Sequence, residues 1–144
     1  MTRQLPGLSI RPKPAGYSGT PLARKLGITE RSRVVPRHAP REYPEWLEPI
    51  PPGAVFEKRV SPRTTIVHLF CDRKAALKSE LLALRNSVRS DAMVWVSWPK
   101  KAAKIPTDIT EDTSRELALP LGFVDVKVCA VSDVWSGLKL VVRR

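Results

Sequence analysis

Two lysines in the second half of the chain have the type and position expected of an anion-binding site. Lys100 and Lys101 follow the uncharged run 92–98 almost directly. Ligands of open parallel sheets gather at the carboxyl ends of strands, where ammonium groups hold phosphates or carboxylates. The turn-forming segment 16–20 adds hydroxyl and backbone N–H donors. We therefore expect an anion site made of Tyr17, Ser18, Thr20, Lys100 and Lys101, with a solvated lysine loop and a plain turn as the alternative.

A basic surface for nucleic acid is the second candidate site. The chain carries 25 Lys and Arg against 14 Asp and Glu, a formal net charge of +11. Such an excess attracts phosphates, and aromatic side chains between arginines can stack on bases. Tyr17 precedes the arginines of 24–41 in the sequence, and Tyr43 and Trp46 follow them. The candidate nucleic-acid contacts are Arg24, Arg31, Arg33 and Arg37, and a solvated arm with no partner is the alternative.

The sequence predicts no catalytic residue, no metal site and no cofactor. Cys71 and Cys129 lack zinc spacing, and we expect both to be reduced, buried thiols. His68 lies within an apolar run, which favours a hydrogen-bonded core histidine over an acid or base, whereas His38 lies in a basic loop and is unassigned. The acids at 108–112 are expected to cap a helix or stabilise its N-terminus.

The elements that must position these residues alternate between strands and helices. Val, Ile, Phe and Trp are concentrated in uncharged runs, while Leu77, Leu81 and Leu84 recur at helical spacing. Asp72 and Thr110 are the expected N-caps of two helices. The expected strands are 33–35, 54–60, 64–70, 92–98, 123–131 and 138–142, and the expected helices are 22–26, 42–50, 73–88 and 110–120.

Repeated strand–helix–strand units favour parallel pairing with right-handed crossovers. The last two strands, joined by the polar loop 132–137, are expected to form an antiparallel hairpin with Trp135 in its loop. The fold class is therefore α/β: a small Rossmann-like three-layer sheet, mostly parallel, with a C-terminal antiparallel hairpin. Residues 1–16 are expected to form a flexible, basic, Pro-rich tail and 17–144 a single domain.

Hydropathy predicts a location in the cytoplasm. The sequence contains no run of about 20 apolar residues and no apolar N-terminal stretch typical of a signal peptide. We therefore expect no membrane partner.

Residues 64–144 resemble the second half of class I S-adenosylmethionine-dependent methyltransferases in their order of elements. That resemblance implies a cofactor site with a glycine-rich turn after the first strand and an acidic residue at the end of the next strand. The equivalent turn here, 36–40 (PRHAP), contains no glycine. The family pattern is therefore incomplete in this chain.

A second resemblance rests on sequence motifs. The segments 16–28 (GYSGTPLARKLGI) and 95–101 (WVSWPKK) are similar to those of a bacterial family of domains of unknown function. The similarity extends to 106–108, 124–131 and 134–141, so it covers most of residues 16–144. It implies a compact bacterial α/β fold and no particular activity. The chain departs from the expected smooth apolar first strand at Pro36, Arg37 and His38.

Three functions are compatible with these patterns. The leading hypothesis is a non-catalytic or regulatory module that binds an anionic small molecule or acidic macromolecule through the basic strand-end surface. The second is a degenerate methyltransferase-like or other small transferase, which predicts a pocket holding Cys71, His38 or Asp108. The third is a nucleic-acid-binding accessory protein.

Overall fold

The computed structural model describes residues 19–144. The expected tail 1–16 lies outside these residues. Six strands form one sheet in the order β2-β1-β3-β4-β6-β5. The strands are β1 (Arg33–Arg37), β2 (Val55–Phe56), β3 (Ile66–Phe70), β4 (Met93–Pro99), β5 (Phe123–Ala130) and β6 (Trp135–Val142).

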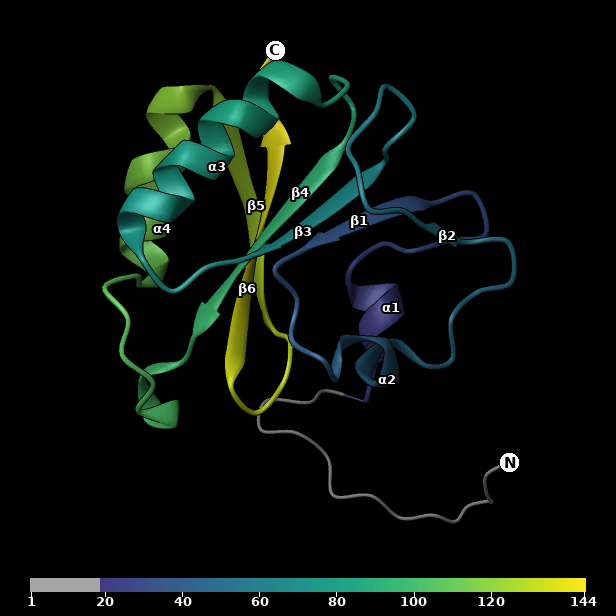
Figure 1. Cartoon of the computed structure of the whole chain (residues 1–144), viewed down its shortest axis with the longest axis horizontal. Coiled ribbons are helices and arrows are strands. Elements are labelled where there is room, and N and C mark those ends of the chain that lie inside the picture. The colour runs from purple at the N-terminus through teal and green to yellow at the C-terminus, as the bar shows by residue number, and fades with distance from the viewer. Residues whose placement is uncertain (1–18) are drawn as a thin grey trace.

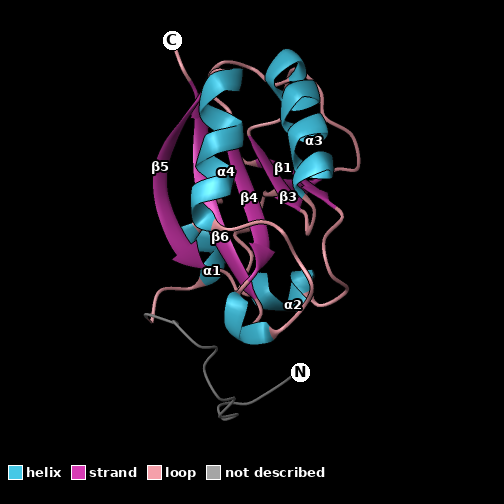
Figure 2. Ribbon diagram, turned by 90° about the vertical axis from the view of Figure 1, so that its left-hand side faces the viewer, coloured by secondary structure: helices cyan, strands magenta, loops and turns pink. Residues whose placement is uncertain are grey.

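Four helices cover the sheet (Figure 1). They are α1 (Leu22–Lys25), α2 (Tyr43–Leu47), α3 (Lys74–Ser87) and α4 (Glu111–Ala118), and two short 3-10 turns, η2 (Lys101–Ala103) and η3 (Leu119–Leu121), accompany them. Figure 2 shows α3 and α4 running side by side along one face of the sheet. Leu77 and Leu81 of α3 pack in one core with Phe123 of β5. The other face packs against α1 and α2 through Leu26 and Leu47. The three-layer α/β prediction is confirmed.

Strand pairing also follows the expected pattern. The first four strands pair in parallel, as the register Val35 to Val67 and His68 to Trp95 shows. β6 pairs antiparallel with both β4 and β5. The sheet is therefore mostly parallel with an antiparallel C-terminal pair, and the carboxyl ends of β1, β3 and β4 lie at one edge.

The helix caps differ in part from the expectation. Thr110 does cap α4, because its side chain accepts from the Thr113 N–H and Thr113 bonds back in a capping box. Asp72, by contrast, does not cap α3. The N-cap of α3 is Arg73, and the carboxylate of Asp108 accepts the Lys74 N–H at 2.7 Å. A distant loop therefore supplies the cap that we expected from the neighbouring residue.

The C-terminal hairpin turn is shorter than expected. Trp135 is the first residue of β6, not part of the loop. The reason is that the Ser132 hydroxyl accepts the N–H groups of both Val134 and Trp135, which closes the turn tightly. Trp135 thereby pairs with Pro99 at the end of β4. Among the described residues, no helix is long and apolar enough to cross a membrane.

Candidate functional site

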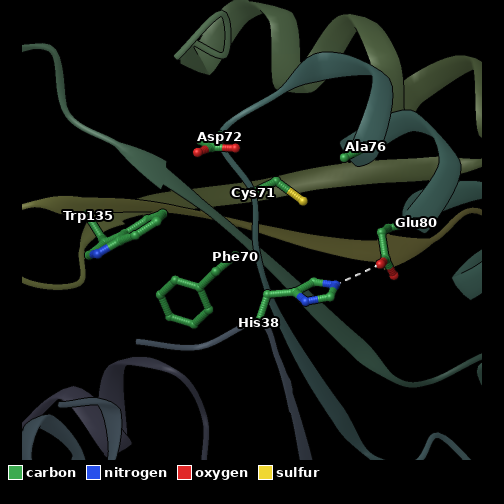
Figure 3. A pocket seen from close by; sticks show the side chains of 7 residues that line it. All are labelled: His38, Phe70, Cys71, Asp72, Ala76, Glu80 and Trp135. Carbon is green, nitrogen blue, oxygen red and sulfur yellow. Dashed lines mark hydrogen bonds and ion pairs between the residues drawn. The ribbon is translucent and has the colours of Figure 1, made fainter. Parts of the chain in front are cut away.

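A pocket opens where the parallel strands β1 and β3 end. It has a volume of about 330 Å³ and is lined by side chains of β3, α3 and β6 and of the turns that follow β1 and β3 (Figure 3). Ligands of open α/β sheets bind at this edge because the strand-end turns leave backbone and side chains free there. The lining residues are His38, Phe70, Cys71, Asp72, Ala76, Glu80 and Trp135.

A second hollow, of about 530 Å³, lies between α1 and the segment around Pro49 and Pro51. It is larger, but Arg24 is the one titratable residue that lines it. Binding sites usually combine an apolar wall with several convergent polar groups. The pocket at the ends of β1 and β3 has that combination, and we take it as the candidate site.

The apolar wall of the pocket consists of two aromatic rings. Phe70, the last residue of β3, is buried, and its ring meets Trp135 edge-on at a centroid distance of 5.1 Å. Behind it, the imidazole of His68 stacks on Phe70 at 4.4 Å. Such ring pairs contribute about 0.5–1.5 kcal/mol beyond their buried area, so the wall is held in one position.

The polar wall is an ion cluster centred on Glu80 of α3. Arg37 donates two hydrogen bonds to its carboxylate, at 2.9 and 3.1 Å, and His38 Nε2 donates a third at 2.9 Å. Partial burial alone would raise the pKa of Glu80, but these bonds hold it below its usual value. The carboxylate is thus ionised at neutral pH and largely compensated by Arg37.

His38 occupies an unusual backbone position. Its φ is 59°, in the left-handed region that favours glycine. It lies in the turn after β1, where the methyltransferase-like resemblance implies a glycine-rich loop. Here an imidazole, still about 60% exposed, lines the pocket and is tied to Glu80. This backbone conformation therefore places the His38 side chain at the pocket. It does not bring bare backbone close to a ligand.

Cys71 lines the pocket as a protonated thiol. Burial raises its pKa to about 12, with the charges of Glu80 and Asp72 adding to the increase against the opposing charge of Arg37. The thiolate is the nucleophilic form of cysteine, and the raised pKa disfavours that form at neutral pH. Burial is confirmed for Cys71, while Cys129 is only half-buried; both are free.

His68 is the hydrogen-bonded core histidine that the sequence predicted. Its two ring nitrogens bond the Tyr43 hydroxyl and the Ser97 hydroxyl, both at 2.8 Å. Complete burial lowers its pKa to about 3, and burial likewise raises the pKa of Tyr43. His68 is therefore neutral and enclosed behind the pocket wall, with no route to a bound molecule.

Of the expected anion-binding residues that the structure describes, Lys100, Lys101 and Thr20, none lines the pocket. Lys100 directly follows β4, and its N–H donates to Val134 O at 2.7 Å, next to Trp135. Lys101 begins η2 and is exposed. Thr20 precedes α1, and Tyr17 and Ser18 lie outside the described residues. The structure thus brings the two lysines to the edge that holds the pocket.

The four candidate arginines for nucleic acid are spread over the molecule. Arg24 is on α1 and Arg31 precedes β1, both exposed, whereas Arg33 and Arg37 occupy opposite ends of β1. Arg33 pairs with Glu57 at 2.7 Å and Arg37 with Glu80. Two of the four arginines are thus engaged in ion pairs, and nucleic-acid binding stays a prediction.

Sequence reasoning missed Glu80, Ala76 and the role of Phe70. Ala76 and Glu80 are four residues apart on α3, so they share one face beside buried Leu77 and Leu81. One signal for Glu80 was available in the sequence. It is a carboxylate beside the apolar face of a helix, and that helix follows a buried strand. In residues 19–144, no group of three metal-ligating side chains occurs.

Comparison with known proteins identifies the fold. No protein-family model and no curated protein matches the sequence. Among solved structures, a protein described as a type 11 methyltransferase from Sulfolobus solfataricus matches with a TM-score of 0.59 at 10% identity, over 85% of this chain and 90% of that one. A 16S rRNA adenine-1408 N1-methyltransferase variant from Catenulisporales acidiphilia gives 0.51 at 14%, over 85% and 90%. The fibrillarin pre-rRNA processing protein of Methanococcus jannaschii gives 0.50 at 9%, over 81% and 69%.

These similarities show a Rossmann-like methyltransferase fold and nothing finer. S-adenosylmethionine is the cofactor that the fold implies, and the residues present fit it poorly. The side chain of His38 stands in the turn where the resemblance implies glycine. β2 has only two residues, and Glu57, which follows it, is tied to Arg33 at the amino end of β1. Both expected cofactor contacts are therefore altered.

Proposed function

We propose that this chain is a non-catalytic binding module whose small-molecule ligand occupies the pocket at the ends of β1 and β3. One observation carries the proposal: the pocket joins an aromatic wall to convergent polar side chains at the edge where α/β sheets bind ligands. Its volume of about 330 Å³ is within the usual range for small-molecule sites, which begins near ~300 Å³.

The titratable groups support binding rather than catalysis. A nucleophile needs a lowered pKa or a neighbouring base, but the Cys71 thiol has a raised pKa of about 12. His68 is enclosed, and the Nε2 of His38 is already bonded to Glu80. These groups shape and hold the pocket without an activated atom facing it.

An anionic group of the ligand binds at Lys100 and Lys101. Pro99 pairs with Trp135, so the lysines that follow Pro99 flank the aromatic wall of the pocket. Inside the pocket the charge of Glu80 is compensated by Arg37, whereas Asp72 keeps an anion from entering deeply. The body of the ligand thus fills the pocket and its anionic end reaches the rim.

A thermal-shift panel tests the proposal. Nucleotides, S-adenosylmethionine, phosphorylated metabolites and short RNA and DNA are each added to the wild type, Trp135→Ala and Lys100→Ala/Lys101→Ala. A ligand at about 100 times its Kd stabilises the folded state by about 2.7 kcal/mol, which raises Tm by several degrees. The same exposed-lysine change on α3, Lys78→Ala, is the matched control.

We expect one ligand class to raise Tm of the wild type and of Lys78→Ala, and to lose its effect in Trp135→Ala. In the double lysine variant, anionic members of that class lose most of their effect. A ligand that stabilises Trp135→Ala as much as the wild type would place binding elsewhere and contradict the proposal.

A degenerate methyltransferase-like or other small transferase is the second candidate. It is favoured by the fold similarity and by the position of the pocket, and it is weakened by the turn at His38 and the short β2. Calorimetric titration with S-adenosylmethionine, together with an assay for turnover of the bound cofactor, separates the two. Saturable binding that Trp135→Ala removes, with turnover, would favour the transferase. Binding without turnover, or no heat at millimolar cofactor, favours the first proposal. Membership of the bacterial family suggested by the sequence motifs is compatible with both.

A further inference from the structure

Asp72 presents a free carboxylate to the pocket. It follows β3, and it is exposed. Its main chain is fixed, because Asp72 O accepts the Thr107 hydroxyl at 2.8 Å and the Asp108 N–H at 3.4 Å. Within residues 19–144, however, the side-chain carboxylate of Asp72 accepts no hydrogen bond and forms no ion pair.

The usual structural role of such a residue is taken by another carboxylate. An aspartate just before a helix normally caps it and interacts with its positive end. In this chain, Asp108 accepts the first N–H of α3, that of Lys74, at 2.7 Å. Helix capping therefore does not account for the Asp72 side chain.

An aromatic ring lines the same pocket as this carboxylate. Figure 3 shows Asp72 and the ring of Trp135 on one side of the pocket, with His38 and Glu80 on the other. A carboxylate attracts a cation by charge, and the face of an indole attracts it through the ring quadrupole. Glu80 on the opposite side is neutralised by Arg37, so Asp72 is the uncompensated charge of the pocket.

We propose that the pocket binds an organic cation of the ammonium type between Asp72 and Trp135. This inference rests on the proposed function and narrows its ligand class. With the anionic group at Lys100 and Lys101, the ligand is a zwitterion whose cationic end lies inside the pocket. Asp72 sets this specificity, because no other carboxylate in the pocket lining lacks a partner.

NMR titration with simple charged probes tests the inference. The probes are choline for the cation, phosphocholine for the zwitterion and inorganic phosphate for the anion. The indole N–H signal of Trp135, assigned by comparison with Trp135→Phe, reports the pocket. Asp72→Asn removes the charge while keeping the shape, and Asp112→Asn removes an equivalent exposed charge on α4. Urea unfolding of both variants checks that they are as stable as the wild type.

We expect choline and phosphocholine to shift the Trp135 indole signal of the wild type and of Asp112→Asn, with phosphocholine binding more tightly. Asp72→Asn weakens the affinity for choline roughly 2- to 5-fold, the range expected for loss of an exposed charge contact. Equal choline affinity in the wild type and Asp72→Asn would overturn the inference. So would an indole shift with phosphate and none with choline, which would still leave the pocket as a binding site. If no probe and no ligand of the thermal-shift panel moves this signal, the proposed function fails as well.

Discussion

Three buried polar side chains from three elements satisfy one another behind the pocket. Tyr43 of α2, His68 of β3 and Ser97 of β4 are almost fully buried and form one chain of hydrogen bonds. A neutral imidazole has one donor and one acceptor nitrogen, and the two hydroxyls use both. Because His68 also stacks on Phe70, this chain fixes the aromatic wall of the pocket.

Removing one hydroxyl from this chain of hydrogen bonds measures how much the chain contributes to the free energy of unfolding. Tyr43→Phe keeps the ring but leaves one nitrogen of buried His68 without a partner. We expect the free energy of unfolding to fall by about 1–3 kcal/mol, the cost of an unsatisfied buried polar group. Urea denaturation measures it, with Ser87→Ala, an exposed hydroxyl on α3, as the control that changes stability by less than about 0.5 kcal/mol. A neutral Tyr43→Phe would show that the buried network is unimportant.

The lowered pKa of His68 also predicts how stability depends on pH. In the folded protein this pKa is about 3, below the value of about 6.5 in an unfolded chain. As pH falls below about 6.5, the unfolded state takes up a proton that the folded state refuses. The stabilisation is therefore complete above pH 6.5 and is lost progressively as pH falls toward 3. Between pH 7 and pH 5 we expect a loss of about 2 kcal/mol.

Denaturation at both pH values checks this, because carboxylates titrate mainly below that window. His68→Asn, which lacks the titrating ring, should lose much less stability over the same interval. An equal loss in both proteins would assign the pH dependence to other groups.

At the scale of elements, the loop before α4 stabilises the start of α3. Asp108 accepts the Lys74 N–H, and Thr107 donates to Asp72 O. These bonds tie together the two segments that lead into α3 and α4. The loop thereby fixes the main chain on which Asp72 sits at the pocket.

Replacing Asp108 and Asp72 one at a time distinguishes their roles. Asp108→Ala removes a helix cap, so we expect a loss of about 0.5–2 kcal/mol. Asp72→Ala removes no hydrogen bond and should cost less than about 0.5 kcal/mol. Chemical denaturation of both variants compares them, with Asp108→Asn as the variant that retains an acceptor. The reverse order of effects would restore Asp72 as the structural cap.

The local sequence pattern predicted most of the strands and helices, but it did not predict the pocket. The strands and helices after residue 63 follow from periodicity, since Leu77, Leu81 and Leu84 face one core. The cap of α3 and the start of β6 were missed because Asp108 and Ser132 act through contacts that depend on the folded loops. Lys100 was correctly expected at a strand end. Phe70, Glu80 and Trp135 come together only because of the order of the strands in the sheet. The sequence does not specify that order, so this part of the pocket could not be predicted.

At the scale of the whole molecule, the net charge of +11 does not describe the pocket. Basic side chains are distributed over the chain, while the cleft at the ends of β1 and β3 contains Asp72 and Glu80 with one compensating arginine, Arg37. Long-range attraction of anions and local recognition in the pocket are therefore separate effects. Lys100 and Lys101, which follow β4, lie at the rim of the pocket.

The most direct test of the pocket as a ligand site is an amide NMR titration of the wild type with the strongest ligand from the thermal-shift panel. We predict that shifted backbone signals cluster at His38, Cys71, Asp72 and Trp135, with smaller changes at Lys100 and Lys101. Signals concentrated instead around Arg24 and Thr29 in the second hollow, or spread over the exposed arginines, would contradict this assignment.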